Sequence, residues 1–507
     1  MRELDQGLRT GPRHAAPRAD RTDRSDQLIA GCVFGGLFFV YLAVSRHTFV
    51  AYDASSMVAV GTNITNHLTL STVGAFDDYL HLSTPYSPYG IGVSLLVVPM
   101  YALSKATGHE MLLLSLINPA LTALAGLVVF AIGRELRWPR TWSVLCAATF
   151  GLLTMALQST TELFSEPAVA LCIVILVWAI LRWRLEWQWA AFVIGLTSAA
   201  VIQFRSDSIL TVWIGLLALP MFVPWTEIRK PRNLAAMGLP VVLSLAFLGW
   251  YNQHRFKNYF VFSYGGQGFH AAIGRGLEGM LVSPGKSIFV FNPIALLGLV
   301  GLALFLRRDR PIAVLFLLLI VPRVLFFAKW DSWDGGVAWG PRFLDPVVSL
   351  FAIAAVEVLV ATRHTKIWGT IARVAFGVLA LLSLGVSFLS VRVPYEQWWQ
   401  TISNPALQAR YDGGHLVPDP NTPGAAQNAF DFTLQGGHLV GDIDLLEDDT
   451  AKTAPWDFQA SREAKGWLLL AAALALMAAA SVLALRSDKR QTGHGTPHEG
   501  SATAPDP

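Results

Sequence analysis

The stretch Ala51-Tyr52-Asp53-Ala54-Ser55-Ser56-Met57 follows closely on the first long apolar segment of the chain, residues 28–45. It opens a more polar region that contains Asp77 and Asp78 and ends in Tyr86-Ser87-Pro88-Tyr89-Gly90, at the start of the next apolar run. A carboxylate at the mouth of an apolar segment, followed by a loop that returns to the same boundary, is an uncommon arrangement. This stretch marks where the chain first leaves the membrane, and the other polar loops are placed relative to it.

Composition places the chain in a membrane. Of its 507 residues, 53% are hydrophobic and only 14% are charged, and the mean hydropathy is +0.46. An apolar run of about 20 residues can cross a bilayer, and such runs recur throughout the sequence. The charge is nearly balanced and the basic residues are dispersed among loops, so no nucleic-acid partner is indicated. The three cysteines lie inside apolar runs and are interpreted as core residues.

The distribution of basic residues decides which apolar runs cross the membrane. If run 90–104 does not cross, the short loops rich in Lys and Arg fall on the side of the N-terminal tail, as expected of cytoplasmic loops. That run is short and contains Pro99, so we expect a helix in the outer interface. About twelve membrane-spanning helices then remain, with both termini in the cytoplasm. They are predicted at 28–45, 111–133, 141–158, 167–181, 188–204, 209–225, 234–251, 288–306, 311–328, 343–361, 371–390 and 464–485.

The predicted fold is thus an all-α polytopic membrane protein with interfacial helices in its first outer loop. The two polar ends are predicted to be disordered cytoplasmic tails, and the segment after the main domain is predicted to be an irregular loop with little core of its own. The expected parts are a tail at 1–27, a transmembrane domain at 28–391 that includes the outer loop 46–110, an extracytoplasmic loop at 392–463, a last transmembrane helix at 464–486 and a tail at 487–507.

Acidic residues on the predicted outer face are candidates for chemistry. A carboxylate just outside a span, such as Asp53, can act as a general base towards a hydroxyl group. The alternative is an N-cap for a helix that begins at Ala54, and both roles can coexist. Asp78 is a further candidate in the same loop. Glu166 lies at the outer end of the span that starts at Pro167, where an acid should face the protein interior or water; its alternative role is to stabilise the helix dipole.

Basic residues on the outer face are few, which makes each of them informative. Arg205 ends an apolar span, and Arg255 follows a run of aromatic and polar residues. Lys286 lies in Ser283-Pro284-Gly285-Lys286-Ser287, directly before a span, where free backbone N–H groups and a cation form a ready anion site. The alternative for Lys286 is a side chain that extends to the interface and anchors the span. We interpret all three as candidate phosphate ligands.

The segment from Trp330 to Arg342 combines tryptophans and acids more densely than any other part of the chain. Tryptophan faces beside Asp331 and Asp334 suit a sugar, which has an apolar ring face and a rim of hydroxyl groups. An interfacial aromatic belt would explain the tryptophans but not the acids. Arg342 opens a span from its outer end and can meet a phosphate or pair with one of these aspartates.

Metal and nucleotide signals are weak. The histidines have no metal-ligand spacing, and Asp442-Ile443-Asp444 alone is little evidence for a metal-bound nucleotide sugar. No cofactor is therefore predicted, and a divalent metal ion is the less favoured alternative.

With these residues laid out, the chain resembles the GT-C superfamily of polyprenyl-phosphate-sugar-dependent glycosyltransferases. The resemblance is to the bacterial branch akin to protein O-mannosyltransferases and lipid A aminoarabinose transferases, and it extends over about residues 28–361. The order and topology of several short motifs carry it. They are Asp53 after the first span, Pro85-Tyr86-Ser87-Pro88-Tyr89-Gly90, Glu162 to Pro167, Asn252 to Phe256, Leu281-Val282-Ser283-Pro284-Gly285-Lys286 and Trp339-Gly340-Pro341-Arg342-Phe343-Leu344.

The resemblance implies inverting transfer of a sugar from a polyprenyl-phosphate donor to an acceptor hydroxyl on the outer face of the plasma membrane. The first-loop aspartate, here Asp53, would be the general base. Arg205, Arg255, Lys286 and Arg342 would bind the donor phosphate, and the sugar or acceptor would meet Glu166, Asp78, Trp330, Asp331 and Asp334. Many relatives carry a second acid next to the first-loop aspartate, but Ala54 follows Asp53 here, which argues against a metal-assisted variant.

The expected partners are the lipid-linked sugar, a glycan, lipid or protein acceptor, and membrane lipids. Two other functions are consistent with a polytopic membrane protein. A transporter or flippase of a lipid-linked saccharide would place ionisable residues near the membrane midplane and show repeat symmetry. A non-catalytic protein of envelope assembly is the third reading. The charges concentrated at outer helix ends favour the transferase.

Overall fold

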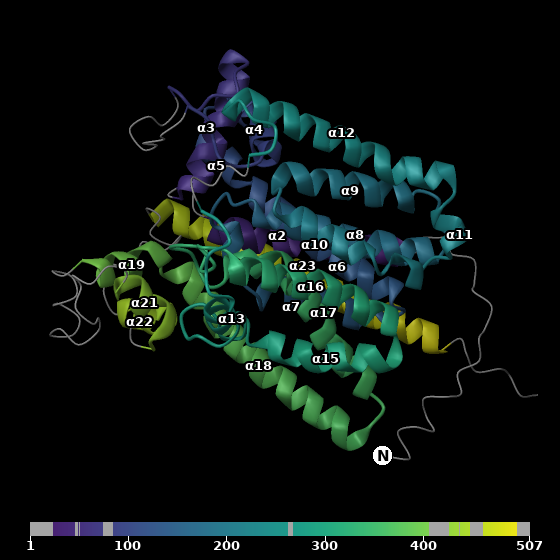
Figure 1. Ribbon diagram of the computed structural model, residues 1–507. Coiled ribbons are helices and arrows are strands. Elements are labelled where there is room, and N and C mark those ends of the chain that lie inside the picture. The colour runs from purple at the N-terminus through teal and green to yellow at the C-terminus, as the bar shows by residue number, and fades with distance from the viewer. Residues whose placement is uncertain are drawn as a thin grey trace, which may run out of the picture.

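The computed structural model describes residues 24–45, 49, 51–74, 85–261, 267–404, 425–434, 437–446 and 460–493, and these residues form helices and connecting loops with no strand among them. The long helices lie side by side in one bundle (Figure 1). They are α2 (Arg24–Val44), α6 (Ile117–Glu135), α7 (Arg140–Leu152), α8 (Glu166–Arg184), α9 (Ala190–Phe204), α10 (Ser208–Leu216), α12 (Pro231–Phe256), α15 (Ile294–Arg308), α16 (Arg310–Lys329), α17 (Asp345–Thr362), α18 (Lys366–Arg392) and α23 (Ala460–Gly493). The short helix α5 (Glu110–Ser115) directly precedes α6.

Each of the twelve predicted spans contains a bundle helix. Among the described residues, eight helical segments are long and apolar enough to cross a membrane, and shorter apolar helices occupy 91–107, 190–204 and 208–221. Helices α7 and α15 fall in the two remaining predicted spans. The expectation of an all-α polytopic membrane protein is therefore confirmed.

The segments predicted to lie outside the membrane on the outer face gather at one end of the bundle. Helices α3 (Tyr52–His67) and α4 (Ile91–Thr107) lie there, and so do α19 (Tyr395–Ser403), α21 (Ala425–Phe432) and α22 (His438–Leu445) (Figure 1). The short helix α11 (Trp225–Ile228) lies at the opposite end. Helix α4 packs against α3 instead of joining the bundle, as expected of run 90–104.

Ion pairs tie the opposite end of the bundle together. Asp26, at the start of α2, pairs with Arg140 at 2.6 Å, and Asp488 near the end of α23 accepts the backbone N–H groups of Arg140 and Thr141 at 3.1 Å. The same end holds the pair of Arg184 and Asp309 at 3.0 Å. The beginning of α2 and the end of α23 therefore meet at one end of the bundle, which agrees with an even number of crossings.

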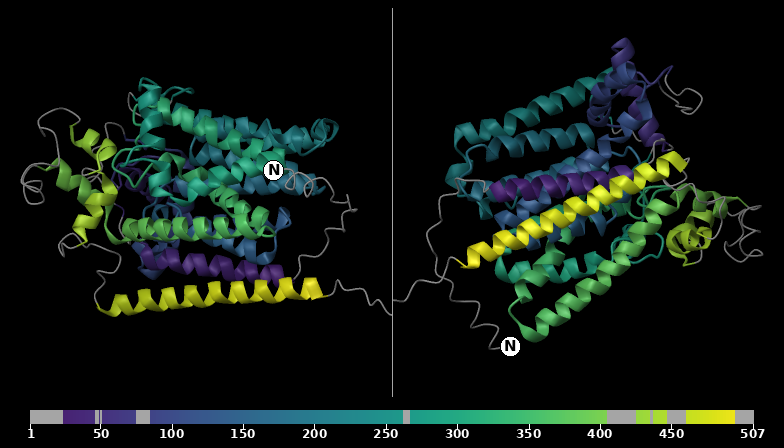
Figure 2. Two further views of the ribbon diagram at one scale, coloured as in Figure 1. Left: turned by 90° about the horizontal axis from the view of Figure 1, so that it is seen from below. Right: turned by 180° about the vertical axis from the view of Figure 1, so that it is seen from behind.

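The first and last long helices are neighbours, although they are far apart in the sequence. Helices α2 and α23 run side by side (Figure 2). Added Cβ atoms at Gly35 and Gly36 would approach Leu476 and Met477 of α23 to 3.0 and 2.8 Å. Small residues let helix backbones approach closely, which replaces the hydrophobic driving force that lipid does not provide.

Helix α17 is the buried centre of the bundle, because every residue of its apolar window is covered by other helices. Helix α15 approaches it through two glycines one turn apart. A Cβ atom on Gly298 would lie 2.7 Å from the carbonyl oxygen of Phe351, and one on Gly301 would lie 1.7 Å from that of Ala354. Any side chain at Gly301 would force the two backbones apart.

The segment 392–463 differs from the expected irregular loop where the structure describes it. Helices α19, α21 and α22 pack together around a small core of Val393, Trp398, Ile402, Ala429, Phe430 and Leu445. The core predicted for this segment was too small, because a few aromatic residues such as Trp398 and Phe430 bury a large area. We call these three helices the cap; they cover the turn at residues 283–287 and the loop 330–342.

Replacement of Gly301 by valine should disrupt the contact between α15 and α17. Overpacking of a tight contact costs about 1–3 kcal/mol, so the variant should unfold at a clearly lower temperature in detergent than the wild type. Gly377 in α18 is the matched control, because an added Cβ there meets nothing within 4 Å. Scanning fluorimetry of both variants is the measurement, and equal unfolding temperatures for Gly301→Val and Gly377→Val would contradict the close approach.

Candidate active site

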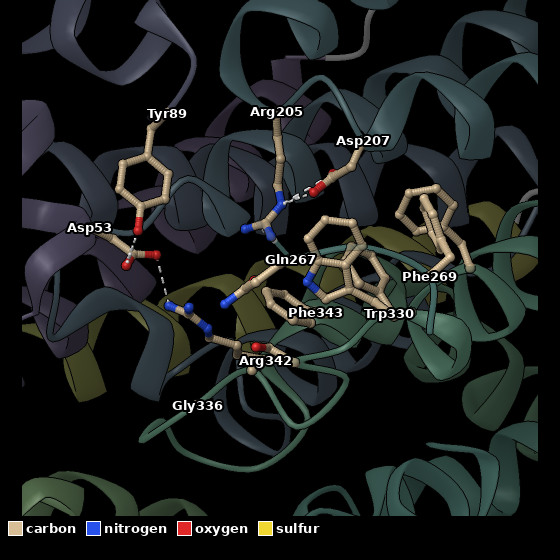
Figure 3. A pocket seen from close by; sticks show the side chains of 14 residues that line it. Asp53, Tyr89, Arg205, Asp207, Gln267, Phe269, Trp330, Gly336, Arg342 and Phe343 are labelled. Carbon is tan, nitrogen blue, oxygen red and sulfur yellow. Dashed lines mark hydrogen bonds and ion pairs between the residues drawn. The ribbon is translucent and has the colours of Figure 1, made fainter. Parts of the chain in front are cut away.

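Asp53 lies in the first turn of α3. The helix begins at Tyr52 and its N-cap is the extended Ala51, so Asp53 is not the N-cap that the sequence allowed, and the N-cap residue makes no side-chain capping bond. The carboxylate instead faces two partners outside its own helix. Tyr89 donates its hydroxyl to Oδ1 at 2.6 Å, and Arg342 donates from Nη1 to Oδ2 at 3.0 Å. Both oxygens of Asp53 are thus engaged by side chains (Figure 3).

Tyr89 is positioned by the loop that connects α3 to α4. Arg255, near the end of α12, donates from Nη1 to the carbonyl oxygens of Ser87 and Tyr89, the latter at 3.0 Å. Its Nη2 donates to Asn252 at 2.9 Å, and its guanidinium lies 3.7 Å from the ring centroid of Tyr251. Arg255 therefore holds the backbone that presents Tyr89 to Asp53.

Arg342 enters the site from the 3-10 turn η3 (Arg342–Leu344), which leads into α17. Its guanidinium lies between two rings, 5.1 Å from the centroid of Phe164 and 5.2 Å from that of Phe343. Gly335 lies against the stem of this side chain, where a Cβ atom would come within 2.9 Å of Cγ of Arg342. With its φ of 76°, Gly335 lets the loop 330–342 fold back on itself.

Arg205 lies just after α9 and is more fully neutralised than Arg342. Its Nη1 pairs with Glu166 at 2.6 Å, and its Nε pairs with Asp207 at 2.9 Å. The guanidinium stacks on Phe343 at 4.7 Å from the ring centroid. Glu166 is buried beneath Arg205, as its position before Pro167 predicts for an acid that avoids lipid.

These side chains surround one cavity of about 240 Å³ at the end of the bundle that carries α3 and the cap. Figure 3 shows Asp53 and Arg342 on one side, Arg205 and Asp207 on another, and Trp330 with Phe269 on a third. The lining residues are Asp53, Tyr89, Arg205, Asp207, Gln267, Phe269, Phe326, Phe327, Trp330, Ser332, Gly335, Gly336, Arg342 and Phe343. Two carboxylates, two arginines and aromatic faces therefore meet in a space that can hold a sugar phosphate.

An apolar groove of about 350 Å³ adjoins this cavity and shares Asp207 and Phe326 with it. Side chains of α10 and α12 form its apolar walls, among them Leu210, Trp213 and Leu248. Arg255 and Asn252 line its polar end. The groove thus runs from the charged cavity along helices that are largely exposed on the bundle surface.

Besides Arg255 and Glu166, four predicted site residues lie away from the cavity or outside the described part of the chain. Asp331 accepts hydrogen bonds from the His270 ring and from the backbone N–H groups of His270 and Gly268. These bonds, that of the His270 ring foremost, lower the pKa of Asp331 to about 2. Asp334 accepts from Gln427 of the cap at 2.7 Å. Lys286 is fully buried behind the cavity wall, and Asp78 lies outside the described residues.

Lys286 supports the loop that carries Arg342. Its Nζ donates to the carbonyl oxygens of Gly336 at 2.8 Å and Ala338 at 2.9 Å. Burial lowers the pKa of this lysine, while Asp431 and Asp334 act in the opposite direction. Lys286 therefore fastens the inner side of loop 330–342 and does not face the cavity.

Asp431 of the cap lies over the same cluster. It accepts from Gln427 at 3.0 Å, and its backbone oxygen accepts the N–H of Gly285 at 3.2 Å. Burial raises the pKa of Asp431 to about 7, helped by Asp334 and opposed by Lys286 and Arg275. An acid of the cap is thus placed where its ionisation affects how the cap packs on the site.

Several cavity residues were not identified from the sequence. Tyr89 stands in a motif that we noted only for its order in the chain, and Asp207 is two residues from Arg205. Gln267 and Phe269 belong to a loop without a distinctive pattern. Asp207 could have been identified from the sequence, because it lies two residues from the predicted cation Arg205.

The charged groups of the cavity do not form a ligand set for a metal ion. Within the part of the chain that the structure describes, no three His, Cys, Asp or Glu side chains lie close enough together to hold one. The oxygens of Asp53 and Asp207 face arginine donors.

Comparisons with known proteins place the fold. No family model matches the chain, and no curated protein matches it. Solved structures do match, and the similarity is one of fold. One structure that shares this fold is ArnT from Cupriavidus metallidurans in the apo state. It is similar over 92% of this chain and 78% of that chain, with a TM-score of 0.51 and 12% identity.

Two further structures are similar at lower scores. ArnT bound to undecaprenyl phosphate matches over 93% of this chain and 81% of that chain, with a TM-score of 0.48 and 12% identity. The archaeal oligosaccharyltransferase AglB from Archaeoglobus fulgidus, in complex with an inhibitory peptide and a dolichol-phosphate, matches over 76% of this chain and 59% of that chain, with a TM-score of 0.46 and 12% identity.

The raised pKa of Asp431 predicts that the packing of the cap weakens as pH rises. Free aspartate has a pKa of about 3.9, so between about pH 4 and 7 the exposed side chain is ionised while the packed one still binds its proton. Stability should therefore fall between about pH 4 and 7, and Asp431→Asn should flatten this dependence. Thermal unfolding in detergent at several pH values is the measurement.

The exposed Glu278→Gln provides the control for this pH series, because it removes an outer-end acid that the cap does not cover. It should keep the slope of the wild type. An Asp431→Asn slope equal to that of the wild type would contradict the prediction.

Proposed function

We propose that the protein is a membrane glycosyltransferase that moves a sugar from a polyprenyl-phosphate donor to an acceptor hydroxyl, with inversion at the anomeric carbon. The observation that carries the proposal is the single cavity in which Asp53, Arg342 and Arg205 meet beside an apolar groove at one end of a transmembrane bundle. By the distribution of basic loops, this end faces the outside of the plasma membrane.

The two compartments suit the two parts of such a donor. An isoprenoid chain matches the groove between α10 and α12, whose walls are apolar and reach the lipid-facing side of the bundle. The phosphate would then stop at the boundary with the cavity, within reach of Arg342 and Arg205. The sugar would stand against Trp330, because an indole face packs well on the apolar face of a sugar ring.

Asp53 is proposed as the general base. It would accept the proton of the acceptor hydroxyl while the acceptor oxygen attacks the anomeric carbon from the face opposite the phosphate. One C–O bond forms, the bond from the anomeric carbon to the phosphate oxygen breaks, and its electron pair leaves with the lipid phosphate. Arginine donors offset the charge that collects on the departing phosphate, a type of stabilisation that is usually the largest in such reactions.

Lys286, Arg255, Asp331 and Asp334 have supporting positions in this proposal. Their charged groups hold the loops that form the cavity wall, so their loss would act through the geometry of the site. Glu166 acts through Arg205 in the same way. The identity of the sugar and of the acceptor is not part of the proposal.

Asp53→Asn should abolish transfer. Loss of a general base costs about 10²–10⁴-fold in rate. The measurement is transfer of labelled sugar from a panel of undecaprenyl-phosphate-linked hexoses and pentoses to membrane acceptors by the purified protein. Glu278→Gln, the same change at an exposed outer-end acid, should transfer at the wild-type rate. Retained transfer by Asp53→Asn would refute the assignment of the base, and no transfer by the wild type with any donor would favour a transporter or an assembly role.

Leu248→Trp should affect donors according to the length of their lipid. The larger side chain would fill part of the groove between α10 and α12, which overlaps with the proposed path of the isoprenoid chain. We expect a rise in KM of about tenfold for a long-chain donor, equal to about 1.4 kcal/mol, and little change for a short-chain analogue. An equal rise for both donors would place the lipid elsewhere.

A further inference from the structure

The two cavity arginines differ in how many acceptors hold them. Arg205 is bound by Glu166, Asp207 and Ser165, so its donors face a fixed set of partners on two sides. Arg342 has only Asp53 as a hydrogen-bond acceptor within the described part of the chain, and its Nε is buried without a partner there. Of the two, Arg342 is the cation with hydrogen-bonding capacity left for a ligand.

The mobility required of Arg342 is small. Its guanidinium lies between the rings of Phe164 and Phe343. These rings do not fix the direction of its N–H groups, so the guanidinium can shift between them. The pair with Asp53 is only partly buried, with 18% of the Arg342 side chain and 14% of the Asp53 side chain exposed. Such a pair is worth less than a fully buried one, so a competing anion can open it.

The charge balance of the site also demands an exchange. Three carboxylates, those of Asp53, Asp207 and Glu166, already face the two arginines. Arg323 lies behind the cavity wall and donates to Phe343 and Ser208, so an added phosphate would meet only arginines that already have carboxylate partners. Phosphate is the ligand for which arginine is best suited, since its planar donors can bind two phosphate oxygens at once.

We propose that the donor phosphate takes Arg342 away from Asp53 by ion-pair exchange, and that Tyr89 alone then holds the freed carboxylate. Oxygen Oδ2, which Arg342 occupies in the free protein, becomes open to the acceptor hydroxyl, while Tyr89 keeps its bond to Oδ1. The base is thus exposed only when a donor is seated. This inference rests on the proposed function, but its test measures binding and does not require transfer.

Tyr89 is the positioning residue in this scheme. Its hydroxyl bond to Oδ1 is 2.6 Å long, and its backbone is held by Arg255 and not by Arg342. The two supports of Asp53 are therefore independent, so one can be exchanged without loss of the other.

Removal of the Asp53 charge should strengthen phosphate binding, because Arg342 is then already released. We expect Asp53→Asn, and Asp53→Ala as a second variant, to bind undecaprenyl phosphate about tenfold more tightly than the wild type, equal to about 1.4 kcal/mol. Arg342→Gln should bind it about tenfold more weakly. The measurement is a binding isotherm in detergent, with unfolding temperatures to confirm that each variant is folded.

Three controls test whether the change in affinity comes from the exchange of the Arg342 ion pair. Asp207→Asn also removes one negative charge from the cavity, but Arg205 stays bound to Glu166. Any increase in affinity for undecaprenyl phosphate should therefore be clearly smaller than that of Asp53→Asn. Undecaprenol, which lacks the phosphate, should bind the wild type and Asp53→Asn equally. Inorganic phosphate separates the headgroup from the lipid, and a gain for Asp53→Asn with phosphate alone would show that the exchange needs only the anion.

Unchanged or weaker binding of undecaprenyl phosphate by both Asp53 variants would overturn the proposed ion-pair exchange. An equal increase in affinity in Asp207→Asn would also overturn it. These results would leave the proposed transfer activity intact, because that activity is tested by its own assay. Tyr89→Phe provides a kinetic test of the positioning role. It should lower kcat while the affinity for undecaprenyl phosphate stays at the wild-type value, and a change confined to affinity would contradict a positioning role.

Discussion

The ion pair of Asp53 and Arg342 joins two parts of the chain that are 289 residues apart and closes the site at one end of the bundle. Each partner would be unfavourable alone in a partly dry cavity, because a charge removed from water needs compensation. The loop after the first helix and the loop before α17 must therefore be fixed closely enough for the two side chains to meet. Much of the polar structure around the cavity serves that requirement.

Three buried cations carry out this fixing by donating to backbone carbonyl groups. Arg255 holds the loop of Tyr89, Lys286 holds the loop at Gly336 and Ala338, and Arg323 of α16 donates to the carbonyl of Phe343 next to Arg342. Carbonyl acceptors satisfy a buried cation without neutralising it, whereas Arg205 and Arg342 face carboxylates in the cavity. Lys286 and Arg323 therefore position loops only, whereas Arg255 also lines the polar end of the groove.

Sequence patterns were sufficient for the bundle but only partly for the site. Long apolar runs and the placement of Lys and Arg predicted the helices and the position of α4 outside the bundle, because these features follow from the cost of exposing polar groups to lipid. Of the residues proposed from the sequence, Asp53, Arg205, Arg342 and Trp330 line one cavity in the structure. Lys286 and Arg255 looked equivalent to them, since sequence does not tell whether a cation faces a carbonyl or a cavity. Tyr89 and Gln267 depend on loop geometry that no local pattern encodes.

The most direct test of this account is an experimental structure of the protein with undecaprenyl phosphate bound. The account predicts the phosphate within hydrogen-bond distance of Arg342 and near Arg205, with the lipid chain between α10 and α12. Asp53 should then be separated from Arg342 but still bonded to Tyr89. A phosphate bound outside this cavity, with the pair of Asp53 and Arg342 intact, would contradict it.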